Sequence, residues 1–276
     1  MRIKTIATAA LVTAAALAFT GCASNETPAA GGTTAAGGSK TLTGVGSSAQ
    51  KAAQEKWVAA FQTKNSTVTV NYSPDGSGAG RSAFIAGAAN FAGSDRPFKD
   101  EEMGAGKFAG CAADSNALNL PVYISPIAVV YNLEGVTELT FDTDTIAGIF
   151  SGKITKWNDP AIVKTNPSAK LPDLAITAVH RGDDSGTTNN FTDTLNKTSP
   201  TVWTEKAADT FPAAFGGEAA NGTSGVIQAV TGGNGSIGYA DASAAGKLGK
   251  ASILVNGKPL QPTADAASAI LDNSKV

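Results

Sequence analysis

Three junctions of one kind recur along this 276-residue chain, and they constrain its fold more than any other feature. At each junction a short apolar run ends in a loop rich in glycine and hydroxyl residues, and a helical pattern follows. The loops span 44–49, 75–80 and 181–187. Because strand–loop–helix units in series build mainly parallel sheets covered by helices, the pattern predicts an α/β fold.

The hydrophobic periodicity places the individual elements. We expect strands at Thr41–Val45, Val68–Tyr72, Pro121–Tyr131, Ile176–His180 and Ile237–Tyr239. We expect helices at Ala49–Lys64, Arg81–Ala89, Asp144–Phe150, Thr187–Leu195 and Val226–Val230. The first helix carries Ala53, Trp57, Ala60 and Phe61 on one face, which should pack on the sheet. The tryptophans Trp57, Trp157 and Trp203 are expected in the core rather than as platforms for a ligand.

The N-terminus has the features of a targeting segment. Two basic residues precede the apolar run Ile6–Phe19, which is too short to span a membrane comfortably. The run ends in Gly21-Cys22 and resembles the lipobox of bacterial lipoproteins. We expect residues 1–21 to be a lipoprotein signal peptide, Cys22 to be the acylated mature N-terminus, and residues 22–40 to be a flexible tether. An ordinary secretory signal with a chance cysteine is the alternative.

The charge balance restricts the partners. The formal net charge is −2. Without residues 1–21, which contain two basic and no acidic residues, 19 basic residues face 23 acidic ones, and the net charge is −4. A mildly acidic body argues against nucleic acid as a partner. It also means that any anion site must be built locally, because the overall field does not attract anions.

The three loops have the chemistry of an anion site. A helix N-terminus presents unpaired N–H groups and partial positive charge, glycine allows close approach to the backbone, and hydroxyls add donors. One such loop is more often a simple helix cap. Three loops in one chain, with Arg181 entering the third, predict converging helix N-termini that hold a tetrahedral oxyanion.

Five motifs carry a specific resemblance. They are GVGSSAQKAAQEKW, NYSPDGSGAG, NFAGSDRPF, IAGIFSGKITKWNDPAI and HRGDDSGTTNNFT. In order and spacing they resemble the extracytoplasmic phosphate-binding proteins of high-affinity phosphate ABC transporters, the PstS family. The resemblance implies a two-lobed periplasmic-binding-protein (type II) fold with the ligand in the cleft between lobes. We expect the lobes at 41–121 and 122–276. Because family members continue further, we expect the first lobe to be incomplete at its C-terminal end.

The resemblance also implies the contacts of the anion. The family's phosphate-binding positions fall on Ser48, Ala49, Ser77, Asp95, Arg181, Ser185, Gly186 and Thr187. Asp183 falls where the family pairs an aspartate with the arginine. Ser48 and Ala49 replace the usual threonine and phenylalanine, so the hydroxyl is kept and the aromatic ring is lost.

Asp95 would provide selectivity. Phosphate keeps at least one proton near neutral pH and can donate a hydrogen bond to a carboxylate. Sulfate has no proton there, so the negative charge of Asp95 would repel it with no hydrogen bond to offset the repulsion. A surface turn role for Asp95 is the alternative.

The implied function is an extracytoplasmic, lipid-anchored receptor that delivers phosphate to a membrane ABC permease, without enzyme activity, cofactor or metal. The rival from another class is a secreted hydrolase that uses His180, Asp183 and Ser185. These residues are crowded into six positions, and the side chain of His180 should point away from that of Arg181 on an alternating strand. A closer rival is a binder of sulfate or molybdate, against which Asp95 argues.

Overall fold

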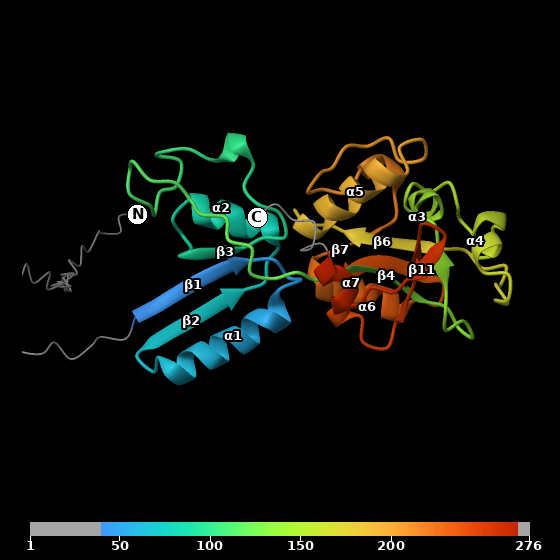
Figure 1. Ribbon diagram of the computed structural model, residues 1–276, viewed down its shortest axis with the longest axis horizontal. Coiled ribbons are helices and arrows are strands. Elements are labelled where there is room, and N and C mark those ends of the chain that lie inside the picture. Colours follow the sequence, from blue (N-terminus) through green and yellow to red (C-terminus); the bar gives the residue numbers. More distant parts are fainter. Residues whose placement is uncertain (1–39, 270–276) are drawn as a thin grey trace, which may run out of the picture. The chain divides into compact units, whose positions relative to one another are not determined.

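The computed structural model describes residues 40–269, drawn in colour in Figure 1. The expected signal peptide, the acylated Cys22 and nearly all of the tether lie outside these residues. No helix among the described residues is long and apolar enough to cross a membrane.

The first strands form a parallel sheet, which we call the N-terminal sheet. Strand β1 (Lys40–Gly46) lies in its centre, between β2 (Val68–Ser73) and β3 (Phe91–Gly93). The connections contain the helices α1 (Lys51–Lys64) and α2 (Ser77–Ile85). Because the three strands run in the same direction, the loops that follow them gather at one edge of the sheet, and two of the glycine-rich loops meet there.

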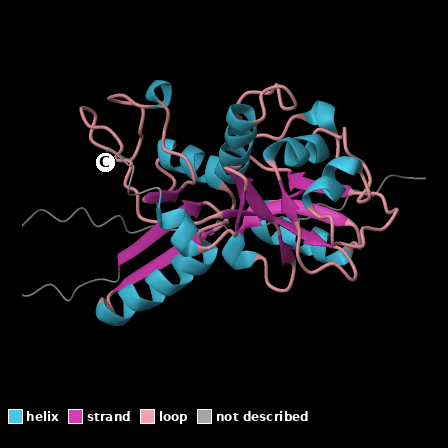
Figure 2. Ribbon diagram, turned by 45° about the vertical axis from the view of Figure 1, so that its right-hand side comes forward, coloured by secondary structure: helices cyan, strands magenta, loops and turns pink. Residues whose placement is uncertain are grey.

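The second sheet has five strands in the order β7-β6-β8-β4-β9, and we call it the central sheet. Strand β6 pairs in parallel with β7 and β8, whereas β4 pairs antiparallel with β8 and β9. The strand bounds are β4 (Ile127–Asn132), β6 (Thr177–Arg181), β7 (Glu218–Ala220), β8 (Ser236–Asp241) and β9 (Gly249–Lys250). Figure 2 shows the sheet in magenta among cyan helices.

Hydrophobic clusters cover both faces of the central sheet. The larger one contains the fully buried Trp157 and Trp203 and a stack of Phe191 on Tyr239 with ring centroids 4.2 Å apart. The smaller one contains Val226 and Val230 and packs on the other face. The helices α3 (Thr143–Phe150) and α5 (Gly186–Thr198) contribute to the larger core, and α6 (Gly222–Gly232) contributes to the smaller one.

The remaining elements are short. A small third sheet has the order β11-β10-β5. The bounds are β5 (Thr140–Phe141), β10 (Ser252–Val255), β11 (Lys258–Leu260), α4 (Pro160–Thr165), α7 (Ala264–Ser268), and the 3₁₀ turns η1 (Asp100–Glu102), η2 (Ala213–Phe215) and η3 (Ala242–Ala244).

Three details of the sequence-based assignment were wrong. Trp57 and Phe61 are 40% and 43% exposed, not core residues, because α1 turns a different face inward, on which Gln54 is buried. The strand expected from Pro121 begins only at Ile127, since the preceding stretch contains two prolines, which lack an N–H to donate.

The second helix begins at Ser77 rather than Arg81. Its glycines weaken a helix intrinsically, but tertiary packing selects them: a Cβ on Gly80 would lie 2.6 Å from the Cα of Gly46. The predicted boundary between lobes at 121 and 122 stays a prediction.

Candidate anion-binding site

The third glycine-rich loop begins α5 in the manner expected. Ser185 is the N-cap residue, and its Oγ accepts a hydrogen bond from the Thr188 N–H at 3.1 Å. The Thr188 hydroxyl in turn contacts the Tyr239 hydroxyl at 2.8 Å, and the Arg181 N–H donates to the same Tyr239 oxygen at 3.2 Å. The end of β6 and the start of α5 are thus tied to one buried tyrosine, which fixes the direction of the helix N-terminus.

Arg181 forms a two-pronged ion pair with Asp183. Its Nε donates to one carboxylate oxygen at 2.7 Å and its Nη2 donates to the other. The Gly222 N–H donates to Asp183 at 2.9 Å. Burial by itself would raise the pKa of Asp183, but the hydrogen bonds from Arg181 and Gly222 outweigh it and hold that pKa below its ordinary value. Asp183 therefore stays ionised beside Arg181, which is buried at 3% exposure.

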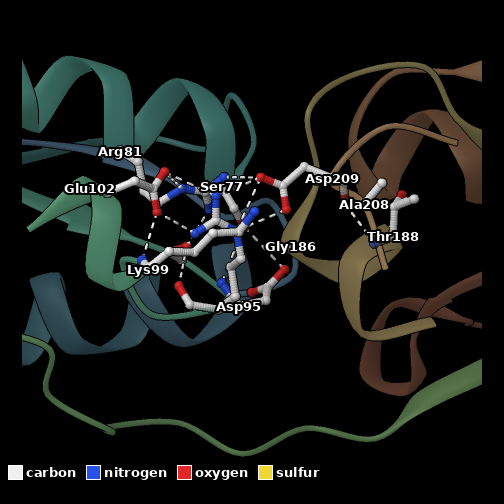
Figure 3. A network of polar contacts seen from close by, with 12 residues as sticks. Ser77, Arg81, Asp95, Lys99, Glu102, Gly186, Thr188, Ala208 and Asp209 are labelled. Atoms are coloured by element: carbon white, nitrogen blue, oxygen red, sulfur yellow. Dashed lines mark hydrogen bonds and ion pairs between the residues drawn. The ribbon is translucent and has the colours of Figure 1, made fainter. Parts of the chain in front are cut away.

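Asp95 lies where the N-termini of α2 and α5 meet. The Thr187 hydroxyl donates to its Oδ2 at 2.9 Å, and the Ser77 hydroxyl contacts the same oxygen at 3.3 Å. Ser77 also accepts from the Asp95 N–H at 3.2 Å, and the Ser47 hydroxyl donates to Oδ1. One carboxylate is thus contacted by hydroxyls from all three glycine-rich loops. Figure 3 shows Ser77, Asp95 and Gly186 close together.

Glycines allow this close approach. A Cβ on Gly186 would lie 2.8 Å from both the Asp95 Cβ and the Ser77 Oγ. A Cβ on Gly78 would lie 2.3 Å from the Asp184 Cβ, and the Gly78 N–H donates to the Asp184 carbonyl at 3.0 Å. Side chains at these positions would separate the two helix N-termini, so the sequence places glycine where the chain passes closest to its neighbours.

The first loop divides its side chains between two partners. Ser47, which the sequence reasoning had not selected, contacts Asp95. The predicted Ser48 instead accepts from the Thr223 N–H at 2.9 Å and contacts the Thr223 hydroxyl at 3.1 Å, at the start of α6. The Ala49 N–H bonds to the Ser47 hydroxyl at 3.2 Å. Ser48 and Ala49 therefore belong to the same loop as Ser47, but their hydrogen bonds go to Thr223 and to Ser47 rather than to Asp95.

The rival catalytic arrangement is not assembled. The His180 ring stacks on Phe211 with centroids 4.2 Å apart, and its Nδ1 contacts the Arg181 carbonyl at 2.9 Å. Ser185 uses its hydroxyl to cap α5. Histidine and serine thus have separate structural partners within the described residues.

Comparison with known proteins places the chain in a family. A model of the PBP superfamily domain matches residues 30–273. Phosphate-binding protein PstS2 of Mycobacterium bovis is 38% identical over 263 residues, which cover 92% of this chain and 70% of that protein. The chain belongs to the PstS family. Phosphate-binding protein PstS 3 of Mycobacterium leprae is 39% identical over 249 residues, or 87% of this chain and 66% of the relative. This PstS-family chain thus spans about two thirds of the length of its curated relatives.

Solved structures confirm the predicted fold. A periplasmic phosphate-binding protein, PfluDING, bound with phosphate, superposes with a TM-score of 0.66 at 23% identity, covering 86% of this chain and 68% of that one. A putative phosphate ABC transporter substrate-binding protein from Clostridium perfringens gives 0.63 at 20% identity, covering 86% and 83%. The two-lobed periplasmic-binding-protein fold is therefore the fold of this PstS-family chain.

Sequence reasoning missed a charged cluster beside the site. Arg81 and Arg96 both contact the carboxylate of Asp209, and Arg96 also contacts Glu102. Arg81 lies one helical turn after Ser77, and Arg96 directly follows Asp95 in the motif NFAGSDRPF. Their positions next to the predicted site residues Ser77 and Asp95 could have indicated a role for both arginines near the site. Nothing in the sequence indicated Asp209 as their partner.

Proposed function

We propose that the protein is an extracytoplasmic receptor that binds inorganic phosphate and delivers it to a membrane ABC permease for import. The observation that carries the proposal is the carboxylate of Asp95, which is contacted by the hydroxyls of Ser77 and Thr187 within the reach of two helix N-termini. The named relatives are phosphate-binding proteins, which supports the same ligand.

The chemistry of this site suits an oxyanion that retains a proton. Arg181 is bound to Asp183, so the pair adds almost no net charge and acts through its hydrogen-bond donors. Ser77, Thr187 and the N–H groups at the start of α5 supply further donors. Asp95 would accept the proton of phosphate, and it would repel an anion that has none.

The function is tested by calorimetry of the purified full chain with phosphate, sulfate and arsenate. Phosphate and arsenate, which both keep a proton near neutral pH, should bind, and sulfate should bind far more weakly. Tight binding of sulfate, or no binding of phosphate, would reject the assignment. We propose a binding role without catalysis because His180 stacks on Phe211 and Ser185 caps a helix. Release of product from a phosphate monoester would contradict this part.

The location of the receptor is a further part of the proposal. We propose that residues 1–21 are removed and that acylated Cys22 anchors the protein at the extracytoplasmic face of the membrane, with 22–40 as the tether. Support comes from the apolar run and its Gly21-Cys22 junction. In cells, Cys22→Ala should release the protein from the membrane fraction or stall its processing. Unchanged membrane association of this variant would contradict lipidation.

A further inference from the structure

Four charged side chains form a compact network beside the candidate site (Figure 3). Arg96 donates to Asp209 through Nε at 2.9 Å and through Nη2 at 2.8 Å. It donates to Glu102 through Nη1 at 2.7 Å. Arg81 donates to the same Asp209 carboxylate and also to the Ser94 hydroxyl at 2.8 Å. Two guanidinium groups therefore hold one carboxylate.

The network connects segments that are far apart in the chain. Arg81 belongs to α2 and Arg96 follows β3, so both are attached to the N-terminal sheet. Asp209 lies 113 residues after Arg96, between α5 and β7 of the central sheet. Its main-chain carbonyl accepts the Ser185 N–H at 2.8 Å. Asp209 is thus bonded by its side chain to Arg81 and Arg96, and by its backbone carbonyl to Ser185, the N-cap residue of α5.

The environment makes this contact energetically important. The Arg81 and Arg96 side chains are only 5% and 10% exposed, and that of Asp209 is 18% exposed. Burial lowers the pKa of Arg81, against the opposing effect of the Asp209 charge. For Arg96 the hydrogen bonds to Glu102 and Asp209 outweigh burial and raise the pKa. Loss of the Asp209 charge would leave two buried guanidinium groups with Glu102 as the one remaining carboxylate of the network, which is more costly than loss of an exposed pair.

The charges of the network cancel. Two arginines face two carboxylates, so the network offers an incoming anion little net attraction. Its donors bond to its own carboxylates, to the Ser94 hydroxyl and to the Pro97 carbonyl. A second anion site or a steering patch is therefore a poor explanation for it, whereas the contacts of Asp209 with Arg81 and Arg96 fit a mechanical connection between the loop before β7 and the region around α2.

We propose that Asp209 is a positioning residue, and that its ion pairs with Arg81 and Arg96 form a clasp that holds the N-terminus of α5 against α2. The clasp rests on the proposed function, because it governs how long phosphate stays bound. It acts through Ser185 and touches no anion itself. Breaking it should accelerate dissociation and leave association and the preference among anions nearly unchanged, since the direct contacts remain.

The first test is Asp209→Asn in the full chain, which removes the charge and keeps the shape. Its Kd for phosphate should rise about tenfold, equal to about 1.4 kcal/mol, mainly through faster dissociation in stopped-flow measurements. The ratio of phosphate to arsenate affinity should stay as in the wild type, and Asp209→Glu should recover part of the loss. The matched control is Asp173→Asn, which breaks the exposed pair of Lys156 and Asp173, 2.6 Å apart, and should change nothing.

A second measurement needs no ligand. Hydrogen exchange at the amides of residues 185–190 should accelerate in Asp209→Asn and stay unchanged in the control. A double-mutant cycle of Asp209→Asn with Arg96→Gln should show coupling in the phosphate Kd, because both changes break the same pair. Additive effects, or a changed association rate with normal dissociation, would overturn the clasp. Failure of the wild-type chain to bind phosphate would instead reject the proposed function, and the exchange result would still decide whether Asp209 positions α5.

Discussion

Gly78→Ala is a sensitive test of whether the two helix N-termini must touch. Gly78 is the second residue of α2, and a Cβ at this position would lie 2.3 Å from the Asp184 Cβ and 3.0 Å from the Asp184 carbonyl oxygen. Both obstacles belong to the loop before α5. The added methyl group therefore opposes the approach of α5 to α2, and leaves each helix able to form.

The size of the effect follows from the overlap. Forcing a methyl group into a closely packed contact costs about 1–3 kcal/mol, which corresponds to a rise in the phosphate Kd of about fivefold to 150-fold. Within α2 itself, alanine is intrinsically favoured over glycine by up to about 1 kcal/mol. The clash can be relieved by separation of the two loops, so binding should suffer more than the free energy of unfolding.

The assay is calorimetric titration of the purified full chain with phosphate, together with thermal unfolding of the ligand-free protein. The control is Gly232→Ala at the end of α6, where a Cβ would meet nothing within 4 Å. This control should bind like the wild type. A wild-type Kd for Gly78→Ala would refute the reasoning, because anion binding would then not require α2 and α5 to approach this closely.

Three further predictions concern single charged groups. Arg181→Ala should weaken phosphate binding more than Thr187→Val in parallel titrations, since a charged contact is worth about 1.5–3 kcal/mol and a neutral one about 1 kcal/mol; the reverse order would mean that its ion-pair partner already neutralises the arginine. Asp95→Asn should lower the ratio of phosphate to sulfate affinity about tenfold, and an unchanged ratio would exclude Asp95 as the proton acceptor. Hydrogen bonds from Arg96 lower the pKa of Glu102 from 4.5 to about 2. The contribution of Glu102 to the free energy of unfolding is therefore present above pH 4.5 and is lost as the pH falls toward 2. Urea unfolding of Glu102→Gln should therefore differ from wild type at neutral pH and converge with it in acid, whereas the exposed control Glu101→Gln should show no such trend.

Local patterns in the sequence predict the α/β fold class and the loops that meet at the candidate site. Glycine and hydroxyl residues before helices act locally, through backbone geometry and helix N-termini, so the loops containing Ser77 and Ser185 were predictable from short windows. The pairing of Arg181 with Asp183 was implied by the resemblance to the PstS family, and the structure forms it. The alternation of apolar runs and helical patterns likewise depends on near neighbours.

Contacts between side chains that are far apart in the chain could not be predicted from such local patterns. Ser47 and Ser48 are adjacent, and the direction of the chain after β1 sends one to Asp95 and the other to Thr223. Trp57 has a periodicity that suits a core position, yet it is exposed because α1 turns another face inward and buries Gln54 instead. Asp209 had no local signal at all. Its role arises because folding places it beside two arginines more than a hundred residues away, and no local rule of sequence encodes a contact between such distant charges.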